Sequence, residues 1–534
     1  MRKFFQSGEP FVWLTGGSLA FCLLIVGFLM YLIASKALVY FWPSDVARIE
    51  MRDGNVTLGE IVEREQIPVA DTDGKKIVHR IKVKRGNRDV YGQDFIWLDE
   101  EEIKDVSYPE DIVTVERREW GNFYGEWKGI AEGGEIHEAG WNDLQKDIDA
   151  AFALHERVQE IARIDIGKLN KKIEDVAIEL RVLEDSGVTT GAKVEALENK
   201  KRELEHESQA VQGELAKMRT SITSAMAMVT VDGRDRELPM MGVVHAYRPN
   251  AMGFVGKAGF YVMKFWEFIF HEPRESNTEG GVFPAIFGTV VMVFIMTLIV
   301  TPFGILAAFY LREYARQGVM VSIVRIAVNN LAGVPSIVFG VFGLGFFIYA
   351  VGSGIDHTFF ADRLPTPTFG TGGVLWASLT LALLTVPVVI VATEEGLAGI
   401  PTGIREGSLA LGATKFETTW RVVLPAVAPS MLTGLILAIA RAAGEVAPLM
   451  LTGVVKLAPS LPINGIFPYV HLDQKFMHLG FHIYDVGFQS PNVDAARPMV
   501  YAASFLLLII VVVLNLAAIQ MRNYLRKRYA LSAV

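Results

Sequence analysis

Two residues of opposite charge, Arg441 and Glu445, stand four positions apart in the otherwise uncharged stretch from Ile439 to Gly453. On a helix, this spacing places both side chains on one face, within reach of each other. The pair is a poor source of stability, because arginine before glutamate is the less favourable order and an arginine near mid-membrane costs at least about 2.5 kcal/mol. A guanidinium fork, however, matches the oxygens of a tetrahedral anion in two parallel bonds. We therefore expect Arg441 to line a pathway and meet an anion, with Glu445 holding it until the anion replaces that partner. A static interhelical ion pair is the alternative.

Polar and helix-breaking residues near these charges indicate irregular backbone beside a cavity. Gly444 and Pro448 would loosen the helix locally. Asn329 and Asn330 either donate to the same anion or bond across helices, since polar residues commonly join spans. Ser336 follows a proline, and this dipeptide predicts a kink whose free backbone groups the serine re-satisfies.

The sequence contains no enzyme motif. The phosphate-binding pattern G-x-x-x-x-G-K-[ST] is absent, so the chain is not expected to hydrolyse ATP itself. The patterns H-E-x-x-H, C-x-x-C and G-x-S-x-G are absent as well, and the ten histidines are scattered. The single cysteine, Cys22, excludes an intrachain disulfide. We expect no catalytic residue, no metal site and no cofactor bound by this chain.

The apolar residues are gathered in blocks. The chain has 534 residues, of which 51% are hydrophobic, and a mean hydropathy of +0.31. Residues 11–33 carry no charge over more than the roughly 20 residues needed to cross a bilayer. A cleaved signal peptide is the alternative for this segment, but its apolar core exceeds the typical length of about 7 to 15 residues, which favours an uncleaved anchor. Five further spans are expected at about 283–311, 326–351, 372–393, 427–454 and 498–520.

The charges divide the chain into an acidic block and a basic remainder. Residues 44–275 hold 33 Lys and Arg against 46 Asp and Glu, a net charge of −13, and the remainder carries +5. An acidic block gives no electrostatic footprint for nucleic acid, which we exclude as a partner. Basic residues in short loops mark the cytoplasmic side of a membrane. They occur at Arg2 and Lys3, from Arg312 to Arg325, from Arg405 to Arg421 and from Arg522 to Arg528. Both termini are therefore expected in the cytoplasm and residues 44–275 outside it.

The block between the first and second spans changes its periodicity along the chain. In 44–140, short β-branched and aromatic runs alternate with Gly, Asp and Asn turn signals, which predicts a β-rich module. In 141–226, apolar heptads flank a short polar turn, which predicts an antiparallel coiled-coil hairpin. Its arms are expected to pack on each other, with completion of the seam by a partner as the alternative. The return segment 227–281 includes the aromatic stretch 243–270, whose Trp and Tyr rings favour the headgroup level of a membrane.

The most specific pattern is the loop between the fourth and fifth spans, REGSLALGATKFETTWRVVLP. Its spacing resembles the EAA loop of ABC importer permeases throughout, with two other small residues in place of the family's alanines. The matching residues are Glu406, Gly407, Ser408, Gly412, Val422, Leu424 and Pro425. Small residues permit a tight turn between two short helices, and a Leu-Pro dipeptide can start the next span. The resemblance implies that this loop docks into a cleft of an ATPase subunit and transmits its closure.

Three further stretches narrow the resemblance. LAGVPSIVFG at 331–340, ALLTVPVVIVATEE at 382–395 and the stretch 439–453 look like PstA-type permeases of the phosphate-specific ABC importer. The likeness covers roughly residues 280–520 and the first span. It implies an α-helical integral membrane protein of the type I ABC permease fold with six transmembrane helices, carrying the β-rich module and the hairpin as an insertion. It also implies one permease half of a phosphate importer in a bacterial cytoplasmic membrane, working by alternating access.

The resemblance also implies partners. These are an ATPase subunit present as a homodimer, which holds ATP and Mg, a second permease subunit of PstC type, an extracytoplasmic phosphate-binding protein, and membrane lipid. The alternatives are a permease for another oxyanion, molybdate or sulfate, and a membrane-anchored envelope sensor or scaffold that works through the hairpin. The expected parts of the chain are 1–43, 44–140, 141–226, 227–281, the permease core 282–521 with its coupling loop 394–425, and the tail 522–534.

Overall fold

The computed structural model describes residues 9–71 and 74–530. Within these residues, six helices are long and apolar enough to cross a membrane, in agreement with the predicted number. They cover Phe11–Val39, Phe283–Tyr314, Ser336–Phe359, Val374–Ala398, Lys415–Gly444 and Val493–Tyr524. Arg2 and Lys3, which entered the orientation argument, lie outside the described residues.

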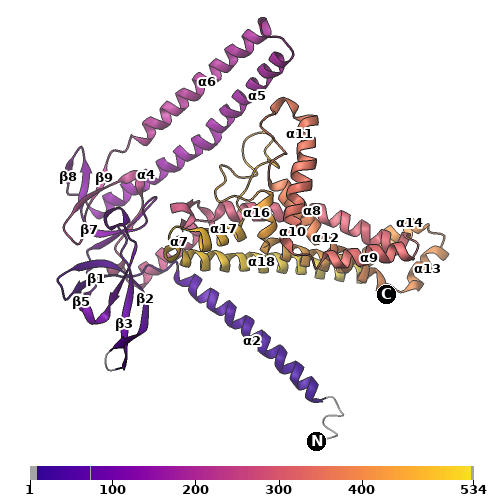
Figure 1. The fold of residues 1–534 in the computed structure, drawn as a ribbon, viewed down its shortest axis with the longest axis horizontal. Coiled ribbons are helices and arrows are strands. Elements are labelled where there is room, and N and C mark those ends of the chain that lie inside the picture. Colours follow the sequence, from indigo (N-terminus) through magenta and orange to yellow (C-terminus); the bar gives the residue numbers. More distant parts are fainter. Residues whose placement is uncertain (1–8, 72–73, 531–534) are drawn as a thin grey trace. The chain divides into compact units, whose positions relative to one another are not determined.

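The chain folds into two compact units, and each unit is assembled from separated segments. The first unit contains Met1–Ile148, Ser224–Val282 and Ile483–Leu506. The second contains Asp149–Thr223, Phe283–His482 and Leu507–Val534. Figure 1 labels the helices and strands along the chain.

The first unit starts with helix α2 (Glu9–Val39) and continues into an antiparallel sheet of order β4-β3-β2-β1-β5. Its strands are β1 (Val46–Met51), β2 (Val56–Asp71), β3 (Gly74–Lys84), β4 (Phe95–Asp99) and β5 (Ile103–Ser107). Ala47, Ile49 and Met51 of β1 pack with Ile81 and Val83 of β3. Every second residue of these strands therefore faces one core, as the period of a strand dictates.

The second sheet of this unit has the order β10-β9-β7-β6-β11, with β8 paired to β7. Its strands are β6 (Ile112–Arg117), β7 (Phe123–Glu132), β8 (Glu135–His137), β9 (Ala225–Val229), β10 (Asp235–Pro239) and β11 (Val243–Tyr247). The sequence prediction confined the β-rich module to 44–140 and assigned 227–281 to a return segment. The structure differs, because β9 pairs with β7 and β11 pairs with β6 across the intervening helices.

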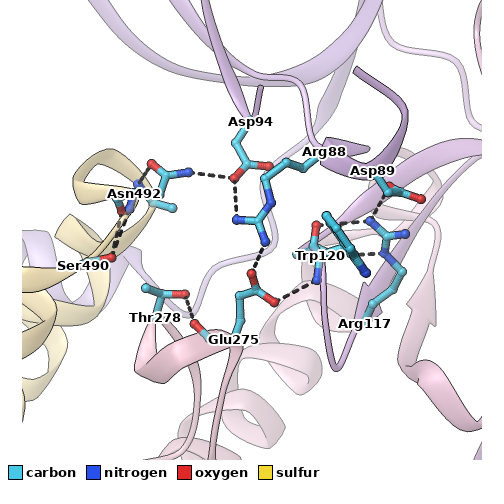
Figure 2. Close-up of polar contacts among 11 residues, drawn as sticks. Arg88, Asp89, Asp94, Arg117, Trp120, Glu275, Thr278, Ser490 and Asn492 are labelled. Atoms are coloured by element: carbon cyan, nitrogen blue, oxygen red, sulfur yellow. Dashed lines mark hydrogen bonds and ion pairs between the residues drawn. The ribbon is translucent and has the colours of Figure 1, made fainter. Parts of the chain in front are cut away.

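Residues at the start of the last span and just before it belong to the first unit. Asn492 donates from Nδ2 to Asp94 Oδ2 at 2.7 Å, and Lys82 Nζ lies 2.7 Å from Asp494 Oδ1. Figure 2 shows Asp94 also facing Arg88, which in turn forms an ion pair with Glu275. Polar contacts therefore join residues of the first unit that are far apart in the sequence.

The second unit contains the predicted helical hairpin. Helix α4 (Trp141–Glu160) leads through a π-helical turn at Ile161–Asp165 into α5 (Ile166–Asp185), and α6 (Ala192–Arg219) returns alongside α5 (Figure 1). Their shared core contains Leu169, Ile173, Val176, Leu180, Leu183, Leu197, Leu204 and Val211. The two arms thus pack on each other, and their supercoiling stays a prediction.

The core of the second unit lies between helices of the permease segment. It joins α8 (Phe283–Phe309), α12 (Val374–Ala398) and α15 (Leu424–Gly444). Fully buried side chains at its centre include Met292 and Met296 of α8, Leu381 of α12 and Ala438 of α15. On α8 and α15, glycines allow close approach, since a Cβ on Gly304 or Gly434 would lie under 3 Å from side chains of α12.

Two of the expected spans contain breaks. The third was predicted at 326–351 as one helix, but α9 (Val319–Leu331) ends before a turn, and the span begins at α10 (Ser336–Phe342). The proline preceding Ser336 disfavours helix for the residue before it, which explains the break. The fifth was predicted at 427–454, whereas its helix starts at Lys415 and ends at Gly444. The second break therefore lies directly after Gly444.

Candidate functional site

The loop between α12 and α15 folds into two short helices, as the EAA-like spacing predicts. They are α13 (Thr402–Ala410) and α14 (Lys415–Thr418). Gly412 has a φ of +88° in the turn between them, a conformation that favours glycine. Thr414 caps α14 in a reciprocal box, because its Oγ1 accepts from Glu417 N at 3.2 Å and its N donates to Glu417 Oε2 at 2.9 Å. The hydroxyls of Ser408 and Thr418 lie 2.9 Å apart and tie the two helices together.

The other residues of the pattern lie on α13, in the turn before α15 and at the start of α15. Glu406 and Gly407 are exposed on α13. A Cβ built on Gly407 meets nothing within 4 Å, so the alanine of the family pattern would fit there. Val422 lies in a π-helical turn that joins α14 to α15, and Leu424 and Pro425 form the first turn of α15.

An ion pair that sequence reasoning missed attaches this loop to the end of α8. Arg405 Nη2 lies 2.9 Å from Glu313 Oε1, and Arg405 also donates to the carbonyl oxygens of Ile400 and Leu397 at 2.7 and 2.8 Å. Glu313 belongs to the π-helical turn Tyr310–Tyr314 that follows α8. The two partners are 92 positions apart, so no local spacing signals them. These contacts join the loop to the end of α8.

The loop exposes a row of large apolar side chains. They are Leu409, Leu411, Phe416 and Trp420, with Leu411 91% exposed. The rings of Phe416 and Trp420 stack with centroids 6.3 Å apart. An exposed apolar row of this kind beside polar residues is typical of a protein–protein interface. The capping box of α14 and the contacts of Arg405 thus hold the loop, on which Glu406 and the apolar side chains are exposed.

The predicted pair of charges forms at the end of a helix rather than within one. Glu445 lies just beyond α15, with φ −78° and ψ 136°, and α16 (Ala447–Thr452) begins afterwards with Pro448 in its first turn. The prediction that both charges share one helical face is therefore wrong for Glu445. Arg441 Nε nevertheless lies 3.6 Å from Glu445 Oε1. The irregular backbone expected around Gly444 is present.

The two breaks lead into helices that pack against each other. A Cβ on Gly340 of α10 would lie 2.7 Å from Cα of Pro448, and one on Gly343 would lie 2.9 Å from Cγ2 of Thr452. Val334, in the first break, packs on the same core as Ala442 and Ala443, which flank the second. Both breaks therefore border one region of the second unit.

The polar candidates of the third span are not all gathered there. Asn329 and Asn330 are exposed near the end of α9, ahead of the break, rather than early in the span. Among the described residues, neither amide shares a hydrogen bond with Arg441 or Glu445. Ser336 is half-buried as the first residue of α10. Only Ser336 is thus placed at a break, as Arg441 and Glu445 are.

Two buried histidines near the second break were missed in the sequence. His478 and His482 are 0% and 2% exposed, and within the described chain His478 Nε2 and both ring nitrogens of His482 lack a hydrogen-bond partner. They flank Gly480, where a Cβ would lie 2.8 Å from Cγ2 of Val446. Burial lowers the pKa of His478 to about 3 and that of His482 to about 4, so both imidazoles are neutral at pH 7. In the sequence, the signal for this pair was the spacing of four residues between the two histidines.

Comparisons with known proteins match the part of the chain that holds the loop and both breaks. The family described as binding-protein-dependent transport system inner membrane component matches residues 300–531. The "Phosphate transport system permease protein PstA 1" of Mycobacterium tuberculosis (strain CDC 1551 / Oshkosh) is 32% identical over 252 residues, which are 47% of this chain and 73% of that protein. The chain belongs to the PstA-type permease family.

Other relatives of this PstA-type permease match a similar share of the chain. The "Probable ABC transporter permease protein YqgI" of Bacillus subtilis (strain 168) is 29% identical over 258 residues, 47% of this chain and 81% of the relative. A solved structure of the inward-facing MetNI methionine ABC transporter is 19% identical, with a TM-score of 0.34, over 45% of this chain and 94% of that one. That likeness is too distant to support arguments about individual residues. The family consists of transmembrane permeases, not of catalytic subunits.

Proposed function

We propose that this PstA-type permease is one half of an ABC importer that carries inorganic phosphate across the cytoplasmic membrane. Support comes from a phosphate transport permease that is 32% identical over 252 residues. The family model matches residues 300–531, which contain the EAA-like loop and the break after Arg441. The observation that carries the proposal is the loop itself, with Gly412 in its left-handed turn and an apolar edge exposed for a partner.

The loop would be the contact with a homodimeric ATPase subunit. In this proposal, Glu406 and the apolar edge of Leu411 and Phe416 enter a cleft of the ATPase, while Arg405 transmits the movement to Glu313. ATP and Mg stay on the ATPase, and this chain binds no cofactor. Because Arg405 is held by four hydrogen bonds to three different groups, the loop would move as a rigid body with the end of α8.

The anion would meet Arg441 near the far end of the fifth span. Sixteen residues separate Arg441 from Pro425, or about 24 Å of helix, which lies within a hydrocarbon core of about 30 Å. The side chains of Arg441 and Glu445 are 31% and 21% exposed on this chain. A charge exposed at such depth is costly against lipid, so we infer that a second permease subunit of PstC type covers it across a shared pathway. Glu445 lies outside the helix, so its side chain would separate from Arg441 when phosphate binds that arginine.

The remaining predicted roles belong to the same proposal. Both termini would be cytoplasmic and the insertion extracytoplasmic, where a phosphate-binding protein delivers the anion. Ser336 would line the pathway at the first break. Asn329 and Asn330, exposed near the end of α9 ahead of the break, would either donate to the anion or bond to another helix.

Transport measurements separate this proposal from its alternatives. Uptake of labelled phosphate, with sulfate and molybdate as competitors, would be measured for the reconstituted importer with wild-type chain, Arg441→Gln and Arg441→Lys. We expect phosphate-selective uptake by wild type, at least a tenfold loss with Gln and a smaller loss with Lys, while the ATPase still co-purifies. Equal competition by sulfate would instead identify a general oxyanion permease. Normal uptake by the Gln variant would make the ion pair static. Absence of uptake by wild type, with no ATPase co-purifying and with Leu411→Glu tolerated, would favour the sensor or scaffold.

A further inference from the structure

Helix α7 (Phe254–Phe270) is fixed on the second sheet by a buried cluster of charges. Lys264 Nζ lies 2.6 Å from Glu116 Oε2 of β6 and 2.7 Å from Glu267 Oε2 of α7. Arg274 Nη2 lies 2.9 Å from Glu267 Oε1, and His245 Nε2 of β11 lies 3.1 Å from Glu267 Oε2. All of these residues belong to the first unit. The helix therefore has a defined face toward the sheet.

The same cluster has the donor set of a metal site but is not suited to one. Ligand atoms of Glu116, His245 and Glu267 lie within 4.8 Å of one another. The Lys264 ammonium, however, already bonds to both carboxylates, and the Arg274 guanidinium adds a second positive charge. The cations of the protein thus balance the two carboxylates, and the cluster serves to hold α7.

The N-terminal membrane helix ends against α7. Phe41, two residues beyond α2, forms edge-to-face contacts with Tyr261, Phe265 and Phe268, with ring centroids 5.8, 5.5 and 5.3 Å apart. Trp42 lies 5.7 Å from Phe254 between ring centroids. Because α2 is uncharged from Phe11 to Ser35 and carries Lys36 in its last turn, these contacts place α7 at the level where that span leaves the hydrocarbon.

The face of α7 that the sheet does not cover is apolar. The exposed side chains are Phe254 (77%), Val255 (84%), Val262 (53%), Met263 (40%), Trp266 (53%) and Phe270 (57%). Within this face, Val255, Val262, Trp266 and Phe270 follow steps of seven, four and four, which is the stripe of one helix side. Gly259 fills the missing position, and a Cβ there would meet nothing within 4 Å. Trp266 and Phe270 stack with centroids 5.4 Å apart.

We propose that this stripe of α7 lies in the lipid headgroup region, in the leaflet where α2 ends, and anchors the insertion to the membrane surface. An apolar helix face at that level would otherwise be in water, and Trp is suited to the interface because its ring is amphipathic. The helix carries only two lysines. Lys264 is held in the buried cluster and Lys257 pairs with Asp45, so neither points to recognition of anionic headgroups. The fitting partner is the acyl–headgroup boundary of any bilayer, including a zwitterionic one.

Spin labelling of the full-length chain in nanodiscs of phosphatidylcholine tests this proposal. Because Cys22 is the single cysteine, a Cys22→Ala background accepts one nitroxide at a time at Val255→Cys, Val262→Cys or Glu237→Cys. Glu237 is exposed on β10 and is the control. Collision of each label with oxygen, which favours lipid, and with a water-soluble nickel complex would be measured by power saturation.

We expect the labels at Val255 and Val262 to prefer oxygen and the label at Glu237 to prefer nickel. Replacing a third of the lipid with phosphatidylglycerol should leave these preferences unchanged. Nickel preference at both α7 positions would overturn the proposal, and so would low collision with both reagents, which would identify a protein covering the stripe. The inference depends on α2 being a span and not on the transported anion, so phosphate uptake of the same variants reports on the proposed function separately.

Discussion

Replacing Glu267 by Gln should lower the stability of the second sheet of the insertion. Gln keeps the size of the side chain but removes the negative charge that faces Lys264, Arg274 and His245. Lys264 keeps Glu116 at 2.6 Å, whereas Arg274 is left with Glu116 at 3.9 Å. One buried cation thereby loses its close partner, and breaking a buried pair in this way costs about 3 to 5 kcal/mol.

Backbone hydrogen exchange of β6 and β11 measures this loss in the full protein, held in nanodiscs. Since about 1.4 kcal/mol corresponds to a factor of ten, amides that exchange through opening of this sheet should exchange roughly 10² to nearly 10⁴ times faster. The control Glu237→Gln changes an exposed carboxylate and should alter stability by less than about 0.5 kcal/mol. Exchange in the Glu267 variant that matches the control would refute the assignment of the cluster as the attachment of α7.

The same cluster predicts a dependence on acid. Burial by itself raises the pKa of Glu267, but the hydrogen bond with His245 and the charges of Lys264 and Arg274 outweigh burial and hold this pKa well below its usual range. A carboxyl with a depressed folded-state pKa contributes stability above its unfolded value of about 4.3 and loses it as the pH falls toward the folded value. Protection of the β6 and β11 amides, corrected for the intrinsic pH dependence of exchange, should therefore fall below about pH 4.3 in wild type and change less in the Gln variant.

Further predictions concern glycine substitutions and Arg405, which joins the loop to the end of α8. Gly412→Ala places a Cβ at a φ of +88°, costs about 1 kcal/mol or more, and should weaken ATPase co-purification several-fold, whereas Gly407→Ala meets open space and should not. Gly340→Ala brings a Cβ to 2.7 Å from the backbone of α16 and should lower thermal stability and uptake, whereas Gly345→Ala should be neutral. Arg405→Gln should leave ATPase binding intact but reduce phosphate uptake per ATP hydrolysed, and equal coupling in wild type and variant would contradict the brace to α8.

The sequence predicted the spans and the loop because their signals are local. Apolar runs of about 20 residues and the spacing from Glu406 to Pro425 need no knowledge of the fold. The break before Ser336 was predicted only as a kink, since the apolar run continues through it and hides the change of helix. The charge cluster around Glu267 could not be predicted, because Glu116 and Lys264 are 148 positions apart and each resembles an ordinary surface charge.

The second sheet was only half predicted for a related reason. Its strands β6 and β7 lie in the predicted module, but β9 and β11 follow the whole hairpin. Strand pairing depends on the neighbours that tertiary structure supplies, so a short run such as AMAMV, residues 225–229, carries little signal alone.

The segment Ser490 to Asp494 has a consequence for the order in which the chain can mature. Lys82 is made early, yet its side chain is only 7% exposed, and its ion-pair partner Asp494 is synthesised more than 400 residues later. Since protein synthesis adds about 5 to 20 residues per second, the Lys82 ammonium lacks this ion-pair partner for tens of seconds. The first unit can therefore form all its contacts only after the start of the last membrane span has been synthesised. A chain truncated before Asp494 would therefore lack the ion-pair partner of this ammonium.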